Sequence, residues 1–132
     1  MRFSFYKMCV LERYFFVEEG VIMFVISRVF KCQKREHSIY KDYFLKQSPL
    51  DHFKGFIKKE LLINDKDKDF DIVRLYVFFE SKKAFYEWEG SPMHIALHKD
   101  KSSSHHQKLD GVIEVYAEKY ESLGSVKFSD ES

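Results

Sequence analysis

The chain has 132 residues, of which 45% are hydrophobic and 17% aromatic. This length has room for one domain, and the composition is far too apolar for a disordered protein. The 22 lysines and arginines nearly balance the 21 aspartates and glutamates, which excludes the strongly basic character of a nucleic-acid-binding protein. Cys9 and Cys32 form neither a CxxC pair nor a disulfide framework, which is typical of the cytoplasm, where we expect this protein. No segment has the length and apolar character needed to span a bilayer, so no membrane partner is expected.

The first segment, residues 1–22, is predicted to stand apart from the domain. Its apolar runs are interrupted by Glu12, Arg13 and Glu18-Glu19-Gly20, so it lacks the continuous apolar stretch of a signal peptide. A purine-rich codon series can encode Glu18-Glu19-Gly20, and Met23 follows at the distance at which a bacterial ribosome-binding site precedes a start codon. We therefore expect translation to begin at Met23. The alternative is a genuine extension that is mobile or packs loosely on the domain.

Residues 23–122 carry strand-like and helix-like patterns that predict one mixed domain, followed by a flexible tail at 123–132. The expected elements, in chain order, are a strand at Met23–Lys31, a helix at Glu36–Gln47, strands at Gly55–Ile63 and Phe70–Glu80, a helix at Ser81–Trp88 that resumes through Met93–Lys99, and a strand at Val112–Tyr120. This β-α-β-β-α-β order predicts an α+β domain of the ferredoxin-like type.

Local signals set the boundaries of these elements. Ser48-Pro49 ends the first helix or starts a short helical turn, and the acidic run Asn64–Asp69 is a solvated hairpin turn. Ser81 is a good N-cap for the second helix. Gly90-Ser91-Pro92 interrupts that helix, and Pro92 is tolerated in the first turn of the piece that follows.

Trp88 is the only tryptophan, and His98 follows it by ten residues on a segment rich in core-type side chains. A neutral imidazole is a common ligand of heme iron, and a heme site otherwise needs apolar walls. Side chains for such walls are available from Trp88, Phe85, Phe79, Met93 and Leu97. The same aromatic residues at helical spacing also fit a plain hydrophobic core, and His98 also fits an exposed histidine near a helix end.

Other candidate chemistry is weaker. His94 and His98 are four residues apart, as in a zinc-binding HxxxH pair, but the glutamate of HExxH is missing and no third ligand is evident. His105-His106 lies in the polar loop Lys101–Lys108 and is expected to be solvated. The sequence has no GxGxxG loop for a flavin or nicotinamide, so electrons for any oxidation must come from an external reductant.

The run from Gly55 through Phe70-Asp71 to Ser81–Trp88 and His98 closely resembles the heme-degrading monooxygenases of the IsdG type, within the antibiotic biosynthesis monooxygenase superfamily. The likeness extends more weakly from Met23 to Tyr120. The glycine-phenylalanine pair at a strand start, the acidic hairpin turn and the SKxAFxxW helix are shared with the wider superfamily. They imply its dimeric α+β barrel, whereas the tryptophan followed by a histidine ten residues later is more specific.

In that family an asparagine, a tryptophan and a histidine serve the heme. The resemblance implies that His98 ligates the iron and that Trp88 presses on the porphyrin and distorts it. The family asparagine falls on Ser27, whose hydroxyl is shorter than an amide and can bond to nearby backbone, so this third catalytic position departs from the pattern. Arg28, Arg74 and nearby lysines are candidates to meet the heme propionates.

The resemblance therefore implies a homodimer, joined through its sheets, that binds heme as both cofactor and substrate. With O2 and an electron donor or reductase it would open the ring to release iron and a bilin-like product. Two alternatives remain. One is a cofactor-free monooxygenase of the same superfamily that acts on a quinol or polyketide-like aromatic. The other is a non-catalytic heme carrier or sensor, which the serine at position 27 favours.

Overall fold

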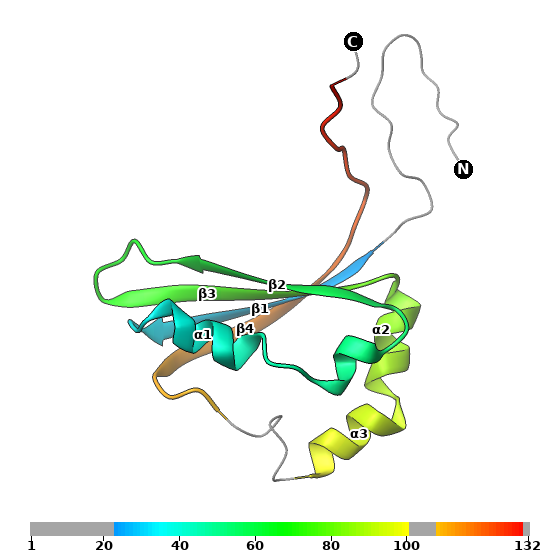
Figure 1. The fold of residues 1–132 in the computed structure, drawn as a ribbon, viewed down its shortest axis with the longest axis horizontal. Coiled ribbons are helices and arrows are strands. Elements are labelled where there is room, and N and C mark those ends of the chain that lie inside the picture. The colour runs from blue at the N-terminus through cyan, green and yellow to red at the C-terminus, as the bar shows by residue number, and fades with distance from the viewer. Residues whose placement is uncertain (1–22, 101–107, 131–132) are drawn as a thin grey trace.

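The computed structural model describes residues 23–100 and 108–130 (Figure 1). Its elements, in chain order, are β1 (Phe24–Gln33), α1 (His37–Phe44), the 3-10 helix η2 (Pro49–His52), β2 (Phe56–Asn64), β3 (Phe70–Phe79), α2 (Lys82–Glu89), α3 (Pro92–Lys99) and β4 (Val112–Glu121). The predicted extension at 1–22, most of the polar loop with His105-His106 and the last two residues of the tail lie outside the described residues.

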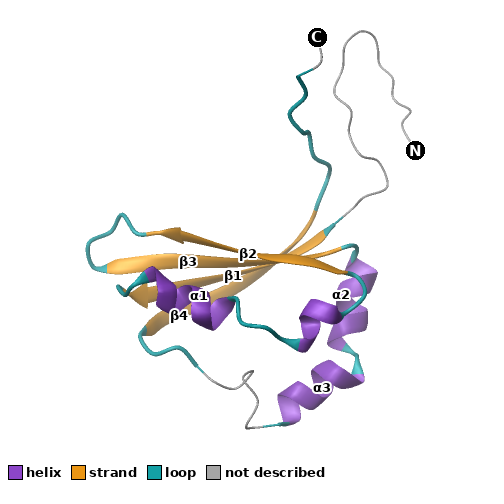
Figure 2. Cartoon of the chain, in the orientation of Figure 1, coloured by secondary structure: helices purple, strands orange, loops and turns teal. Residues whose placement is uncertain are grey.

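The strands form a four-stranded antiparallel sheet in the order β2-β3-β1-β4. All the helices of the described ranges lie against one face of this sheet, and none of them lies on the other face (Figures 1 and 2). In this strand order the first and last strands, β1 and β4, are neighbours, as in a ferredoxin-like α+β domain. The fold class predicted from the sequence is confirmed.

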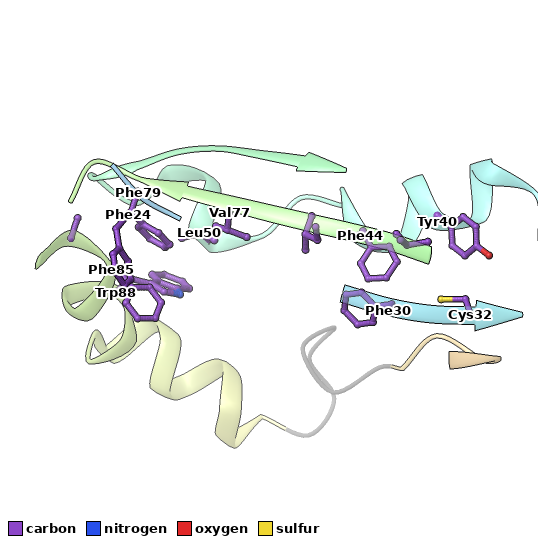
Figure 3. Packing of buried hydrophobic residues seen from close by; sticks show 13 residues of the cluster. Phe24, Phe30, Cys32, Tyr40, Phe44, Leu50, Val77, Phe79, Phe85 and Trp88 are labelled. Atoms are coloured by element: carbon purple, nitrogen blue, oxygen red, sulfur yellow. The ribbon is translucent and has the colours of Figure 1, made fainter. Parts of the chain in front are cut away.

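The core lies between the sheet and the helices. Along β3 every second residue is buried, beginning with Asp71 and ending with Phe79, as expected of a strand with one face on a core. Phe79 packs edge to face on Phe85 of α2, with ring centroids 5.4 Å apart, and Phe24 of β1 lies 5.3 Å from the same ring (Figure 3). Burying one such phenylalanine stabilises the fold by about 1.5–3 kcal/mol.

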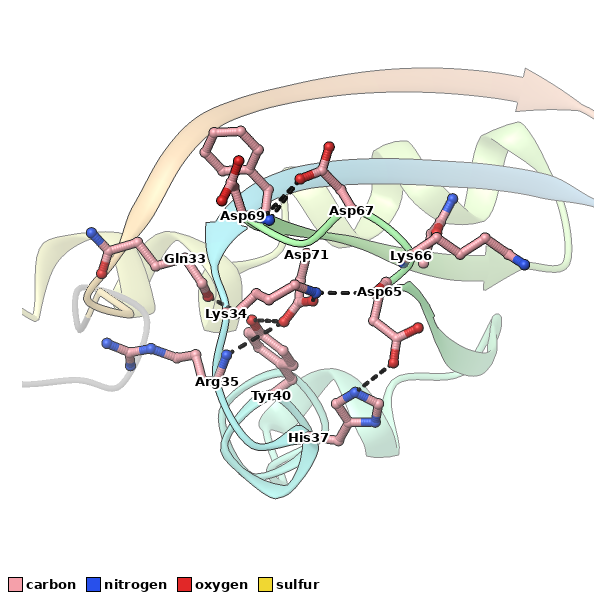
Figure 4. A network of polar contacts seen from close by, with 12 residues as sticks. Gln33, Lys34, Arg35, His37, Tyr40, Asp65, Lys66, Asp67, Asp69 and Asp71 are labelled. Carbon is pink, nitrogen blue, oxygen red and sulfur yellow. Dashed lines mark hydrogen bonds and ion pairs between the residues drawn. The ribbon is translucent and has the colours of Figure 1, made fainter.

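A buried carboxylate attaches α1 to the sheet. The hydroxyl of Tyr40 donates to Asp71 at 2.6 Å, and the ammonium group of Lys34 lies 2.9 Å from the other carboxylate oxygen (Figure 4). Burial works to raise the pKa of Asp71, but these bonds and the backbone N–H of Arg35 outweigh it, so the pKa lies below its ordinary value. Burial and the bond to Asp71 raise the pKa of Tyr40 well above normal, so its proton stays in this bond.

The first helix is shorter than predicted, because α1 ends at Phe44 and not at Gln47. Ser48 has an extended backbone, as the residue before a proline prefers. Its backbone N–H donates to the carboxylate of Asp51 at 3.0 Å, which begins η2 at Pro49. The shorter helix leaves the segment from Leu45 to Ser48 free of helical geometry, and part of that segment lines the cavity described below.

The sheet face without helices is rich in aromatic and aliphatic side chains. Ile72, Arg74, Tyr76 and Phe78 of β3 alternate with the core residues and so point to this face. Burial works to lower the pKa of Arg74, but interactions with Tyr116 of β4 and with Tyr76 outweigh it, so the pKa lies above its ordinary value. Within the described ranges, no helix is long and apolar enough to cross a membrane.

Candidate functional site

A cavity of about 770 Å³ opens between the helix-bearing face of the sheet and the helices. Its volume falls in the range of small-molecule and cofactor sites. Apolar and aromatic side chains make up much of the wall, among them Phe30, Phe44, Leu50, Val77, Trp88 and Leu97. In Figure 3 Trp88 lies at one end of this group, while Phe30 and Phe44 lie toward the other.

Trp88 reaches the cavity because α2 has a defined start and a buried side. The hydroxyl of Ser81 accepts the N–H of Ala84 at 3.0 Å and caps the helix, as predicted. The helix then buries Ala84, Phe85 and Trp88, and only 6% of Trp88 is exposed. Its ring contacts Phe53 edge to face, with centroids 5.2 Å apart. Trp88 is thus a rigid wall residue and a core residue at once.

The imidazole that lines the cavity belongs to His94. Ser91 caps α3 by accepting the N–H of His94. Pro92 occupies the first turn of this helix, as predicted from the sequence. The His94 ring is 9% exposed and lies 5.1 Å from the ring of Trp88, centroid to centroid. Its Nδ1 is 3.1 Å from the backbone carbonyl oxygen of Glu89, and the Glu89 carboxylate lies 3.8 Å from its Nε2.

His98, the predicted heme ligand, lies one helical turn further on and is exposed. It is not among the described residues that line the cavity. Its Nε2 is 3.0 Å from Nε2 of His94, and the two rings meet at 90° with centroids 4.4 Å apart. Among the described residues, no group of three or more histidines, cysteines or carboxylates could hold a metal ion.

Ser27, the predicted third catalytic residue, points away from the cavity. It is paired with Tyr76 and with Glu118, and Tyr76 belongs to the helix-free face. Its side chain is fully buried there, and its hydroxyl has no hydrogen-bond partner. The structure therefore does not bring Ser27 together with Trp88 and His98.

The remaining predicted wall residues are divided between three environments. Leu97 lines the cavity. Phe79 and Phe85 are buried in the core next to Trp88 and do not line the cavity. Met93 is 47% exposed on α3. Of the predicted heme contacts, Trp88 and Leu97 therefore lie on the cavity wall.

The cavity also has basic side chains in its lining; the sequence analysis named Arg28 and unspecified lysines as candidates for such a role but did not single out Lys46, Lys59 or Lys108. Arg28, Lys46, Lys59 and Lys108 all line it, and Glu114 is the one carboxylate among its described wall residues. Arg74, the other arginine considered for propionates, is on the opposite face of the sheet. Successive residues of a strand point to opposite faces of the sheet, so Ser27 and Arg28 cannot both face the cavity. This alternation was the signal that could have indicated Arg28 in place of Ser27.

Neither a protein-family model nor a curated protein matches the sequence. Solved structures share its fold. A candidate antibiotic biosynthesis monooxygenase from Bacillus cereus is similar with a TM-score of 0.63 at 23% identity, over 81% of this chain and 98% of that one. The heme-degrader MhuD from Mycobacterium tuberculosis, with two hemes in its active site, gives 0.52 at 18% identity over 78% and 99%. SnoaB, a cofactor-independent oxygenase from Streptomyces nogalater, gives 0.50 at 13% over 80% and 97%.

Proposed function

We propose that this protein is a monooxygenase that binds heme in the cavity and cleaves it with O2 and electrons from an external donor. The observation that carries the proposal is the wall of Trp88 and the His94–His98 pair beside a basic cavity of about 770 Å³. The likeness in fold to MhuD and to SnoaB supports an oxygenase in general. The IsdG-like spacing of Trp88 and His98 supports heme as the ligand.

The cavity residues fit heme in three respects. The volume is that of a cofactor site, and the walls are aromatic and aliphatic. The basic side chains of the lining suit the two propionates. An imidazole, that of His94, lies on the wall. Bound heme would supply the iron that activates dioxygen and would itself be the substrate.

The hydrogen bonds of the histidine pair define which nitrogen is available to a ligand. The carbonyl oxygen of Glu89 can only accept, so Nδ1 of His94 carries the proton and Nε2 holds the lone pair. The N–H at Nε2 of His98 then donates to that lone pair across 3.0 Å. Iron ligation by His94 requires only that His98 release this bond, whereas ligation by His98 also requires its ring to enter the cavity. We therefore propose His94 as the iron ligand, in place of His98, the ligand predicted from the sequence.

The other wall residues act on the shape of the bound ligand. Trp88 is held by its contacts to Phe53 and His94, so it cannot yield easily to a planar macrocycle beside it. Pressure from this ring would bend the porphyrin, as the resemblance implies. Leu97 and Phe30 make the adjoining wall apolar, which would limit the access of water to a bound ligand.

A hemin titration tests the proposal. Hemin is added to the purified protein, the Soret band is followed to saturation, and ascorbate is then added in air. We expect a saturable Soret shift, followed by bleaching and a new bilin-like absorbance. A Soret band that stays intact under reductant and O2 would instead identify a carrier or sensor, and the absence of any shift would remove heme from the function.

Two observations favour a second candidate, the cofactor-free oxygenase of small aromatic substrates. Ser27 points to the other face of the sheet, and Nε2 of His98 is bonded to His94 and not directed at the cavity. The discriminating measurement is O2 uptake by hemin-free protein with a dihydroxynaphthalene substrate. Uptake by protein that stays colourless with hemin would establish this second candidate.

We further propose that the helix-free sheet face joins two copies of the chain. Val29 and Ser27 are already buried at its centre, while Leu62, Tyr116 and Tyr120 at its edges are each more than two-fifths exposed. A second copy of the same face would cover these edge side chains. The dimer implied by the resemblance is supported by this surface.

A further inference from the structure

We propose that Lys46 and Lys59 form a binding site for a carboxylate of the cavity ligand, and that the ligand is therefore an aromatic or porphyrin-type acid. The inference rests on the proposed role of the cavity as the ligand site, and it names the chemistry that selects the ligand. It holds for a heme propionate and for a small aromatic acid alike, and the experiment below separates these two sources.

Lys59 is a charged side chain turned into the molecule. Its strand position pairs with Val77, a wall residue of the cavity, so it projects to the helix-bearing side. Its side chain is only 17% exposed. A lysine in such a place needs a counter-charge, because burying an ammonium group without a partner is costly.

The charge of Lys59 is poorly compensated by the protein itself. Among the described residues, the carboxylate oxygen paired with its ammonium group is that of Asp51, 4.0 Å away, and the other oxygen of Asp51 accepts the N–H of Ser48. Burial and the neighbouring charge of Lys46 lower the pKa of Lys59, while Asp51 acts in the opposite direction. An anion between the two lysines would relieve both the burial and the repulsion.

Lys46 adds a second positive charge to this part of the cavity. It lies in the segment between α1 and η2, with its ammonium group 4.8 Å from the centre of the Tyr43 ring. Tyr43, Lys46, Ser48 and Lys59 all line the cavity, so a cationic end with a hydroxyl group stands within the same space as the Trp88 and His94 wall. A flat apolar body with a carboxylate at one end matches this division.

The experiment compares each acid with its uncharged analogue. Hemin and hemin dimethyl ester form one pair, followed by the Soret band, and 2-naphthoate and its methyl ester form the other. Naphthalene binding is read from the emission of Trp88, which is the only tryptophan of the chain and lines the cavity. Both pairs are measured on wild type, K59M, K59R and the control K58M, whose lysine is exposed and lies over Phe78 on the opposite face.

We expect K59M to bind at least one of the two acids about tenfold more weakly than wild type, with the matching ester unchanged. K59R should bind nearly as wild type, because it keeps the charge, and K58M should be unchanged. Thermal unfolding of K59M serves as the folding check. Equal binding of acid and ester by wild type, or equal acid binding by wild type and a folded K59M, would overturn the carboxylate site.

The two pairs distinguish this inference from the proposed function. Loss of hemin binding on K59M with the ester retained identifies the propionate as the source of the carboxylate. If hemin does not bind but naphthoate does, and K59M weakens it, heme fails and the carboxylate site stands. If neither acid binds to wild type, the carboxylate site is wrong together with the ligand-binding role of the cavity.

Discussion

The Nε2 atoms of His94 and His98 lie 3.0 Å apart, with the two rings perpendicular. One of these nitrogens must donate its proton and the other must accept it with its lone pair. Neither of the two nitrogens is therefore available to a ligand while this hydrogen bond is in place. Because His94 alone of the two lines the cavity, the pair has an inner and an outer member. The outer member controls whether the inner lone pair is available.

The first prediction separates the two histidines. We expect His94→Ala to weaken hemin binding at least about tenfold, or by about 1.4 kcal/mol, because it removes the ring on the cavity wall. His98→Ala should keep the ligated Soret spectrum, because it frees the Nε2 lone pair of His94. The reverse pattern, with ligation lost only in His98→Ala, would restore the assignment made from the sequence.

The second prediction concerns the approach of α2 to the loop before β2. Gly55 has a φ of +107°, and a Cβ atom there would lie 2.8 Å from Cβ of Ala84. Gly55→Ala should therefore lower the free energy of unfolding by about 2 kcal/mol or more, seen as a lower urea midpoint. Gly90→Ala is the matched control, because a Cβ there meets its nearest atom at 3.6 Å and the φ is −93°. Equal effects of the two substitutions would contradict the close packing.

The third prediction concerns the buried carboxylate of Asp71. Its pKa is below the ordinary value in the folded protein, so its contribution to stability is present above the unfolded pKa of about 3.9 and disappears as the pH falls through the folded value. Asp71→Asn should cost about 3 kcal/mol at pH 7, because Lys34 and Tyr40 lose their charged partner. The difference from wild type should shrink below about pH 3.9.

The measurement for Asp71 is urea unfolding across this pH range, with Asp42→Asn as control. Asp42 is exposed on α1, the helix that carries Tyr40, so its replacement should change stability by less than about 0.5 kcal/mol. A cost for Asp71→Asn that did not vary with pH would mean that the substitution acts through packing and not through the charge.

The fourth prediction tests the helix-free face as a dimer interface. We expect wild type to sediment with twice the 15.9 kDa mass of the chain. Tyr116→Glu should shift the protein toward monomer, because it would bury a charge in the proposed interface. Ile95→Glu, at an exposed position on α3, is the control and should leave the mass unchanged. A monomeric wild type would contradict the proposed interface.

The order of the elements could be predicted from the sequence because each one carries a local signal. Ser81 caps α2 and Pro92 lies in the first turn of α3 as expected, and β3 alternates between core and outer residues along its whole length. These signals depend on a few neighbouring residues and on the backbone they favour. The ferredoxin-like topology follows from that order, so it too was predictable.

Only the tertiary structure decided which face of its strand or helix each site residue occupies. Val25, Ile26, Val29 and Phe30 give β1 apolar side chains on both faces, so its sequence does not indicate which face meets the helices. The face that each residue of β1 occupies differs from the expected one by a single position, so Arg28 lines the cavity and Ser27 lies on the opposite face. In the same way, the sequence gives the spacing of His94 and His98, but only the packing of α3 against Trp88 makes His94 the inner ring. The chain itself thus determined its elements and their order, whereas the composition of the cavity was set by which side of each element the long-range contacts buried.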